Sequence, residues 1–235
     1  MKGLVIVTGG TKGIGRAVIN RFASEGYPVA ACARNAADLE ALKQEVAALP
    51  GAAAVHVKPC DMSKKEEVAA FAEWLLGLEL PIDLLCNNAG VFIPGKISEE
   101  QEGALELMVN TNLYSAYHLT RALLPAMMGR RQGHIFNICS TASIMPYING
   151  GSYCISKYAL LGMTKVLREE MKEHGLRVTA VMPGATLTAS WEGVDLPEER
   201  FMKSEDVAEA IWAAWTLSDR TVVEELLLRP QLGDI

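Results

Sequence analysis

The sequence has no excess of basic residues. Its 22 Lys and Arg residues are outnumbered by 28 Asp and Glu residues, so the net charge is -6 and the pI is near 5.3. Proteins bind nucleic acids largely by neutralising phosphates with cationic side chains. We therefore expect no nucleic-acid partner and a small-molecule ligand instead.

Long hydrophobic runs and clustered cysteines are also absent. No apolar stretch approaches the ~18 residues of a membrane span, and the amino-terminal MKGLVIVTGG leads into a glycine turn, unlike a signal-peptide cleavage region. The five cysteines are scattered, with no C-x-x-C pair and no histidine at metal-ligand spacing. We expect a cytoplasmic protein with reduced thiols, no membrane partner and no metal.

A catalytic role for Cys139 or Cys154 stays open, because both lie near the candidate functional residues below.

The chain does contain enough apolar material for a folded core. Half of its 235 residues are hydrophobic and 21% are charged, and the mean hydropathy is +0.15. A disordered chain is poorer in apolar residues than this. An α/β chain of this length is commonly one domain, and no linker, repeat or low-complexity tract interrupts it. We therefore expect a single domain over residues 1–235.

Strand-like and helix-like segments alternate along the chain. Short apolar runs predict strands, and apolar residues at the helical period predict helices. Strands are expected at residues 4–7, 29–33, 54–58, 84–87, 134–138, 177–181 and 222–228. Helices are expected at residues 14–25, 37–48, 63–76, 98–125, 153–174 and 204–217. This alternation predicts a doubly wound parallel sheet of about seven strands, with helices on both faces and right-handed crossovers.

Serines and one proline mark the expected helix ends. Ser63 and Ser98 each precede a Glu or Gln by three residues, which matches the capping-box pattern, and Ser204 is expected to cap the last helix. Pro125 predicts the end of the helix that begins near residue 98. The longest irregular segment, about 185–203, is expected to be a substrate loop, because such loops in compact domains are often lids or binding loops.

A glycine-rich turn joins the first strand to the first helix. In TGGTKGIG, residues 8–15, the glycines allow a tight turn and leave room for a pyrophosphate, while the helix N-terminus offers free N–H groups to the anion. The spacing G-x-x-x-G-x-G differs from the G-x-G-x-x-G pattern, so a purely structural turn stays an alternative. The residues expected to contact a dinucleotide here are Gly9, Thr11, Lys12, Gly13, Ile14 and Gly15.

The second strand is followed by a basic residue at the place where NAD-binding proteins carry an acidic one. An acidic side chain there accepts hydrogen bonds from the ribose 2′-hydroxyl and repels a 2′-phosphate. Arg34 occupies this place, and its planar guanidinium could pair with the phosphate while Lys12 adds a second positive charge. We therefore predict NADP(H) as the cofactor. The alternative is that both side chains are solvated surface cations.

A tyrosine and a lysine are spaced to share one face of a predicted helix. Tyr153 and Lys157 are four residues apart, and a nearby ammonium favours phenolate, which would lower the phenol pKa from about 10. Ser140 precedes Tyr153 by 13 residues, at the end of a predicted strand where ligand crevices form. Its hydroxyl could hold a carbonyl oxygen. Alone, a Tyr-x-x-x-Lys pair occurs often by chance on amphipathic helices.

Together these motifs resemble the short-chain dehydrogenase/reductase family over nearly the whole chain. The matching segments, in family order, are residues 8–15, 87–90 (NNAG), Asn112, Ser140, 153–157 (YCISK) and 183–184 (PG). The resemblance implies a Rossmann fold with Tyr153 as general acid in carbonyl reduction. It also implies that Lys157 lowers the pKa of Tyr153 and bonds the nicotinamide ribose, and that Ser140 orients the carbonyl. Homodimers or homotetramers are implied as well.

The same resemblance assigns further positions. Asn112 would support a water that links the lysine to solvent, and it matches better than Asn110 because Leu113 follows directly. The implied cofactor contacts are Asp61 beside adenine, Asn88, Ala89 and Gly90 at the adenosine ribose, and Pro183, Gly184, Thr186 and Thr188 near the nicotinamide. Of the two threonines, Thr188 matches the family position for the carboxamide and Thr186 competes with it. Asn87 and Asn88 could instead tie adjacent strands together.

The substrate is only partly narrowed by the sequence. Residues 110–113, 133–136 and 220–234 resemble a bacterial branch of the family that includes sepiapterin reductases, which implies NADPH-dependent reduction of a pteridine side-chain ketone. Reduction of 3-oxoacyl thioesters, oxidation of 3-hydroxy amino acids and reduction of xenobiotic ketones stay open. A non-catalytic NADP-binding regulatory protein is a further alternative, which the intact Ser140, Tyr153 and Lys157 disfavour. The residues expected to border the substrate are Phe92, Ile93, Met145, Tyr147 and Trp191.

Overall fold

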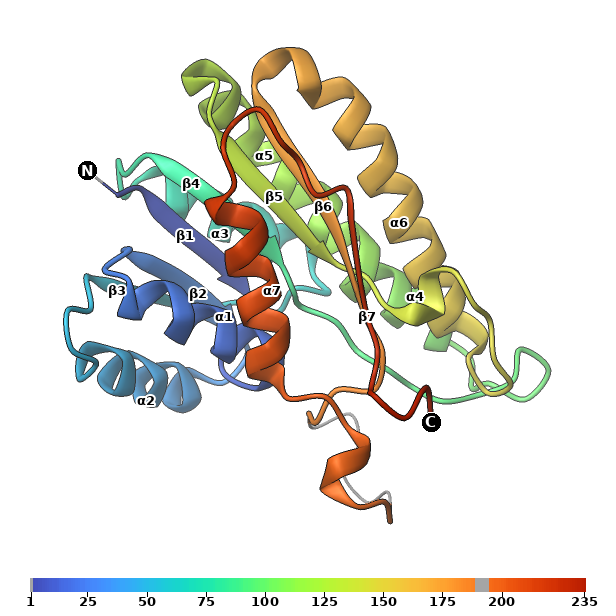
Figure 1. The fold of residues 1–235 in the computed structure, drawn as a ribbon. Coiled ribbons are helices and arrows are strands. Elements are labelled where there is room, and N and C mark those ends of the chain that lie inside the picture. The colour runs from blue at the N-terminus through green and yellow to red at the C-terminus, as the bar shows by residue number, and fades with distance from the viewer. Residues whose placement is uncertain (1, 189–194) are drawn as a thin grey trace.

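The strands that the structure describes form one parallel sheet (Figure 1). The protein was analysed as a computed structural model, which describes residues 2–188 and 195–235. The strand order is β3-β2-β1-β4-β5-β6-β7, and each neighbouring pair is parallel. The strands are β1 (Leu4–Thr8), β2 (Val29–Ala33), β3 (Val55–Pro59), β4 (Ile82–Asn87), β5 (Gly133–Ile138), β6 (Leu176–Pro183) and β7 (Glu225–Leu228). The order reverses between β1 and β4, and the carboxyl ends of strands at such a switch point border a crevice.

Helices cover both faces of this sheet (Figure 1). Helices α1, α2 and α7 pack against one face of the sheet, and helices α3, α5 and α6 pack against the other. The helices are α1 (Gly13–Ser24), α2 (Ala36–Ala47), α3 (Lys65–Leu76), α4 (Ala104–Val109), a π-helical segment (Asn110–Tyr114), α5 (Ser115–Arg130), α6 (Gly151–Met171) and α7 (Ser204–Thr216). Short 3₁₀ segments cover Thr141–Ser143, Lys172–His174 and Glu198–Arg200. The predicted doubly wound Rossmann fold is confirmed.

Strand β1 shows why its sequence suits the centre of such a sheet. Leu4 and Ile6 belong to one buried cluster, whereas Val5 and Val7 belong to the cluster on the opposite face. All four side chains are fully buried. Because successive side chains of a strand point to opposite faces, a strand covered on both sides needs a continuous apolar run.

Two predicted capping boxes are wrong. Helix α3 starts after Lys64, and the Ser63 hydroxyl donates a hydrogen bond to Asp61 Oδ1 (2.8 Å) instead of capping the helix. Ser98 lies well before α4, which starts after Gly103 in a left-handed backbone conformation with φ of 87°. Side-chain spacing alone could not distinguish a helix cap from a local turn, because serine and aspartate form both.

The predicted ends of two other helices also need correction. Ser204 is the first residue of α7 and its hydroxyl donates to the carbonyl of Leu187 (3.3 Å), so it is not the N-cap. Pro125 lies inside α5, which continues to Arg130. A proline removes the hydrogen bond to the carbonyl four residues earlier. That residue, Arg121, is exposed like Pro125 itself, so the freed carbonyl can be hydrated.

The described residues contain no membrane-crossing helix and no cluster of metal-binding side chains. None of the helices in residues 2–188 and 195–235 combines the length and apolar character of a membrane span. Within the same residues, no group of three or more His, Cys, Asp or Glu side chains could hold a metal ion. The cysteines are unpaired and buried. Burial raises the pKa of Cys139 to about 11, which makes a nucleophilic thiolate at that position unfavourable.

Candidate active site

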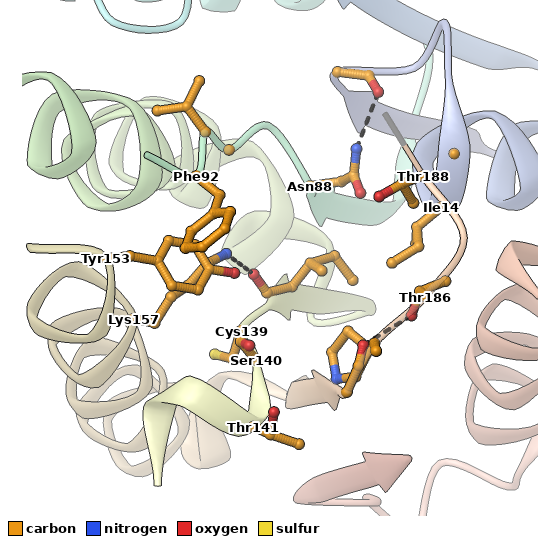
Figure 2. Close-up of a pocket in the computed structure, with 18 of the residues that line it drawn as sticks. Ile14, Asn88, Phe92, Cys139, Ser140, Thr141, Tyr153, Lys157, Thr186 and Thr188 are labelled. Atoms are coloured by element: carbon orange, nitrogen blue, oxygen red, sulfur yellow. Dashed lines mark hydrogen bonds between the residues drawn. The ribbon is translucent and has the colours of Figure 1, made fainter. Parts of the chain in front are cut away.

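The carboxyl ends of the central strands border a cleft of about 560 Å³ (Figure 2). Its walls come from the glycine turn after β1, the segments that follow β4, β5 and β6, and the first turns of α6. Tyr153 and Lys157 lie across the cleft from Ile14 and Thr188 (Figure 2). The predicted site residues that line it are Gly9, Lys12, Gly13, Ile14, Asn88, Ala89, Gly90, Ser140, Tyr153, Lys157, Pro183, Gly184, Thr186 and Thr188.

The glycine turn has the backbone conformation that its glycines permit. Gly9 and Gly13 have φ values of 66° and 52°, in the left-handed region that other residues avoid. A Cβ atom on Gly13 would lie 2.8 Å from Cγ2 of Thr188, so a side chain there would push into the opposite wall. Helix α1 begins after Lys12 with no side chain capping its first turn. Its first N–H groups are therefore available to an anion.

Asn88 both lines the cleft and ties β4 to the glycine turn. Its Nδ2 atom donates to the carbonyls of Thr8 (2.8 Å) and Gly9 (3.0 Å), while its backbone N–H donates to the Thr8 hydroxyl (3.0 Å). Asn87 points into the sheet, where its Nδ2 atom donates to Asn137 Oδ1 (2.8 Å) and to the hydroxyl of Thr120 (2.9 Å). Asn87 therefore ties adjacent strands together, as the alternative for these two residues predicted. Asn88 ties β4 to the glycine turn and also forms part of the cleft wall.

Ser140 is held by a small capping motif that begins at the end of β5. Its Oγ atom accepts the backbone N–H of Ala142 (3.1 Å), and its own N–H donates to Ser143 Oγ (3.2 Å). The Ser140 hydroxyl also acts on the Tyr153 phenol, where it lowers the pKa of that group. Two hydroxyls from separate elements thus meet at one point of the cleft.

Tyr153 and Lys157 both reach the cleft from α6, as their spacing predicted. The Nζ atom of Lys157 lies 5.8 Å from the centroid of the Tyr153 ring and donates a hydrogen bond to the carbonyl of Ile138 (2.7 Å). Lys157 is only 5% exposed and has no carboxylate partner among the described residues. A buried ammonium without an ionic partner is costly, so its position calls for a functional explanation.

Burial moves the pKa values of these two groups in opposite directions. It raises the pKa of the Tyr153 phenol to about 12, and the hydrogen bond with Ser140 only partly opposes this. Burial lowers the pKa of the Lys157 ammonium to about 8. Lys157 is therefore not found to lower the pKa of Tyr153 in this structure, and desolvation of the phenol outweighs the lowering by Ser140.

Asn112 lies behind the cleft wall and not in it. It belongs to the π-helical segment and is 1% exposed. Its Nδ2 atom donates to the carbonyl of Val91 (3.0 Å) and to Ser156 Oγ (2.9 Å), and its Oδ1 atom accepts the N–H of Val91 (2.7 Å). The side chain thus holds the segment after β4 against α6. The predicted link from Asn112 through a water stays a prediction.

Four predicted cofactor residues lie outside the cleft lining, namely Thr11, Gly15, Arg34 and Asp61. Gly15 is buried, and a Cβ atom there would lie 2.5 Å from Asn88 Nδ2. Arg34 is exposed just after β2. Burial raises the pKa of Asp61, but hydrogen bonds from Ser63 and the charges of Lys64 and Arg34 outweigh it, so the net shift is downward. The positive field of Arg34 therefore reaches Asp61.

Three of the residues that were expected to border the substrate line the cleft. Phe92 packs edge-on against Tyr153 with ring centroids 4.8 Å apart (Figure 2), and Met145 and Tyr147 also line the cleft. Ile93 is exposed and does not line it. Trp191 lies outside the described residues, as does the middle of the predicted substrate loop.

Sequence reasoning missed the cleft residues at the carboxyl end of the chain. Asp234 and Ile235 line the cleft, and an ion pair with Arg229 (2.9 Å) holds the Asp234 carboxylate. Arg200 also donates to the carbonyl of Asp234 (3.4 Å). Nothing local in the sequence indicates this position, because only the path of the chain after β7 returns residue 234 to the ends of the strands.

Known proteins of one family match most of this chain. The family model described as short chain dehydrogenase matches residues 3–198. The chain belongs to the short-chain dehydrogenase family. A family relative, the sepiapterin reductase of Chlorobaculum tepidum, is 35% identical over 243 residues, covering 100% of this chain and 99% of that protein. Dehydrogenase/reductase SDR family member 7B of Bos taurus is 35% identical over 185 residues, which cover 77% of this chain and 57% of that protein.

Solved structures of short-chain dehydrogenases share the whole fold. A metagenomic short-chain oxidoreductase in complex with NADP has a TM-score of 0.84 and 32% identity, covering 98% of both chains. The closed form of a serine dehydrogenase complexed with NADP+ has a TM-score of 0.88 and 29% identity, covering 99% of this chain and 96% of the other. The predictions of the family and of an oxidoreductase are confirmed.

Proposed function

We propose that this short-chain dehydrogenase is an NADPH-dependent carbonyl reductase. The observation that carries the proposal is the convergence of Ser140, Tyr153 and Lys157 on one cleft, with the Lys157 ammonium 5.8 Å from the centroid of the Tyr153 ring. A non-catalytic regulatory protein would not need a buried, unpaired ammonium in its binding cleft.

The residues of the cleft suit a nicotinamide dinucleotide. The uncapped start of α1 offers N–H donors for a pyrophosphate, and Gly9 and Gly13 keep side chains out of its path. Lys157 would hold the nicotinamide ribose, and Thr188 or Thr186 would meet the carboxamide. The bound dinucleotide would supply the reducing equivalents. Structural relatives that were solved with NADP support this choice.

The side chains of the protein would orient the carbonyl and transfer the proton. Ser140 and Tyr153 would both donate hydrogen bonds to the carbonyl oxygen, and Tyr153 would give up its phenolic proton as negative charge develops on that oxygen. The ammonium of Lys157 would then stabilise the phenolate that remains. Asn112 would keep the wall after β4 in contact with α6 and so keep these groups in register.

Replacing Arg34 with alanine should raise the KM for NADPH by about tenfold to thirtyfold, because one charge-assisted hydrogen bond to a phosphate contributes about 1.5–2 kcal/mol. The KM for NADH should change less than about twofold. The matched control is Arg16→Ala, which removes an exposed arginine of α1 that pairs with Glu45. Steady-state kinetics with both cofactors checks the prediction, and equal changes for NADPH and NADH would refute it.

For the substrate we propose a pteridine side-chain ketone, as the name of the Chlorobaculum tepidum relative suggests. Phe92, Met145 and Tyr147 give the cleft a broad apolar wall that suits a flat ring. The carboxylate of Asp234 supports a ring with amino groups, because it could accept hydrogen bonds from them. Reduction of 3-oxoacyl thioesters and oxidation of 3-hydroxy amino acids remain the competing activities.

The test is NADPH oxidation with a panel of pteridine ketones, 3-oxoacyl thioesters, quinones and small ketones, with 3-hydroxy amino acids assayed in the oxidative direction. We expect the highest kcat/KM with a pteridine ketone. Asp234→Asn should then lower kcat/KM for that substrate by about tenfold, the value of one charge-assisted hydrogen bond, and leave small ketones nearly unchanged. A preference for a thioester, or equal losses on all substrates, would reject the pteridine proposal.

We further infer that residues 1–235 act as one domain and assemble as a homodimer or homotetramer through α5 and α6. Exposed apolar side chains on these helices support this, namely Tyr117, Ile155, Tyr158 and Val166. Large exposed apolar groups on adjacent helices are typical of protein interfaces. Light scattering coupled to gel filtration would determine the assembly. The cytoplasmic location stays a prediction.

A further inference from the structure

Helix α6, which carries Tyr153 and Lys157, has no cap of its own. Its N-cap residue is Gly150, and no acidic residue lies in its first turn. The missing cap comes from Glu100, which lies between β4 and α4. Glu100 Oε1 accepts the backbone N–H of Ser152 (2.8 Å), and Oε2 accepts the Ser152 hydroxyl. A carboxylate at this place satisfies a free N–H and opposes the positive end of the helix dipole.

The surrounding backbone is shaped around the Glu100 side chain. A Cβ atom on Gly95 would lie 2.6 Å from Glu100 Cγ, and a Cβ atom on Gly151 would lie 2.7 Å from the carbonyl of Gly95. Gly95 also pairs with Gly150 in a parallel bridge, and its N–H donates to the carbonyl of Asn149 (2.9 Å). Glycines on both chain segments thus allow the close approach of Gly95 to the start of α6, and the Glu100 carboxylate stabilises this contact by its hydrogen bonds to Ser152.

This contact acts directly on the residue before the proposed acid. Ser152 is 2% exposed and immediately precedes Tyr153. The segment that carries Glu100 also carries Phe92, whose ring packs on the phenol (Figure 2). One segment therefore holds Tyr153 at two points, its ring and the start of its helix. Lys157 lies a full turn further along α6, where the helix makes its own hydrogen bonds.

We propose that Glu100 is a positioning residue for the proton donor. It fixes the first turn of α6 and thereby the place of the Tyr153 hydroxyl opposite Ser140. The proposal rests on the proposed carbonyl reductase activity and names a further residue of the same site. Without the carboxylate, the first turn of α6 loses its cap and its compensating charge, and helix ends without such partners fray.

The activity test compares Glu100→Ala, Glu100→Gln and the control Glu99→Ala. Glu99 is the exposed neighbour, and it pairs with Lys96 (2.9 Å) on the surface. We expect Glu100→Ala to lower kcat about tenfold or more, because small displacements of a catalytic group cost up to about 10²-fold. The Kd for NADPH should stay within about twofold, since Lys157, its proposed contact on α6, lies a full turn beyond Ser152. Glutamine should recover most of the loss, because its amide oxygen can accept the Ser152 N–H.

Two further measurements do not depend on turnover. In Glu100→Ala, hydrogen exchange at the amides of residues 152–154 should quicken at least tenfold, whereas Glu99→Ala leaves it unchanged. The phenol of Tyr153 should become more hydrated, so its pKa should fall from its raised value toward about 10. Tyrosine ¹³Cζ NMR, assigned with Tyr153→Phe, would follow this titration.

The outcomes separate this proposal from the proposed function. A wild-type protein that reduces none of the carbonyls would reject the reductase activity, while exchange and the phenol titration would still decide the role of Glu100. If Glu100→Ala keeps kcat within twofold of Glu99→Ala, or leaves the exchange and the titration unchanged, the positioning role is wrong. Should Glu100→Ala fail to fold, Ser152→Ala removes the hydroxyl half of the same contact and carries the same expectations at smaller size.

Discussion

Replacing Tyr153 with phenylalanine is expected to lower kcat for carbonyl reduction by about 10³-fold, within the range that positioned proton donors contribute. The phenylalanine ring should keep the edge-on contact with Phe92, because that contact involves only ring atoms. The loss would then come from the missing proton and not from altered packing. Binding of NADPH, followed by fluorescence titration, should change less than about threefold.

A second tyrosine in the cleft provides a matched control. Tyr147 also lines the cleft, and burial raises the pKa of its phenol above the usual range. Ser140 acts on the pKa of Tyr153 and is not among the groups that shift the pKa of Tyr147. Tyr147→Phe should therefore keep kcat within about threefold of wild type. Two results would show that Tyr153 is not the acid. Tyr153→Phe could retain more than a tenth of the wild-type kcat, or Tyr147→Phe could lower kcat more than Tyr153→Phe does.

The fold could be predicted where local sequence and tertiary context agree. The continuous apolar run of β1 predicts a strand buried on both faces, and its side chains do alternate between two clusters. Helix ends were harder, because Ser63 and Ser98 obey a local rule that turns also satisfy. Pro125 was misleading for a different reason. Proline is unfavourable inside any helix, but Pro125 lies on an exposed face of α5, where water can replace the lost hydrogen bond and the helix continues to Arg130.

The candidate site could be predicted where its residues are linked by short spacing. Tyr153 and Lys157 share a helix face because they are one turn apart, and both do reach the cleft. Asp234 and Glu100 could not be found in this way. Their partners lie on distant segments, such as Ser152 for Glu100, so only the folded chain brings them together. The raised pKa of Tyr153 could not be predicted either, because desolvation depends on how deeply the fold buries the phenol.

Replacing Lys157 with methionine is expected to lower kcat by at least about 10²-fold, because the phenolate left after proton transfer would lose the nearby Lys157 ammonium. Among the described residues, Lys157 is the cation that lies nearest the Tyr153 ring, at 5.8 Å. The KM for NADPH should rise as well, since the proposed bond to the nicotinamide ribose is lost. Lys12→Met is the control for kcat alone, because it removes an exposed cation from the end of the cleft where the phosphates are proposed to bind. Equal kcat values for the two variants would exclude a role for Lys157 in the proton transfer.

The same substitution should change how the free energy of unfolding depends on pH. Burial lowers the pKa of Lys157 from 10.5 to about 8, so between these values the unfolded chain binds more protons than the folded one. Folded wild-type protein therefore bears the full cost of its buried ammonium below pH 8 and sheds it as the pH rises toward 10.5. The shift corresponds to about 3 kcal/mol. Urea unfolding from pH 7.5 to 10.5 should show the wild type gaining that much stability relative to Lys157→Met. Parallel profiles would mean that Lys157 has the same pKa in the folded and the unfolded chain, so that the folded protein bears no cost for burying this ammonium.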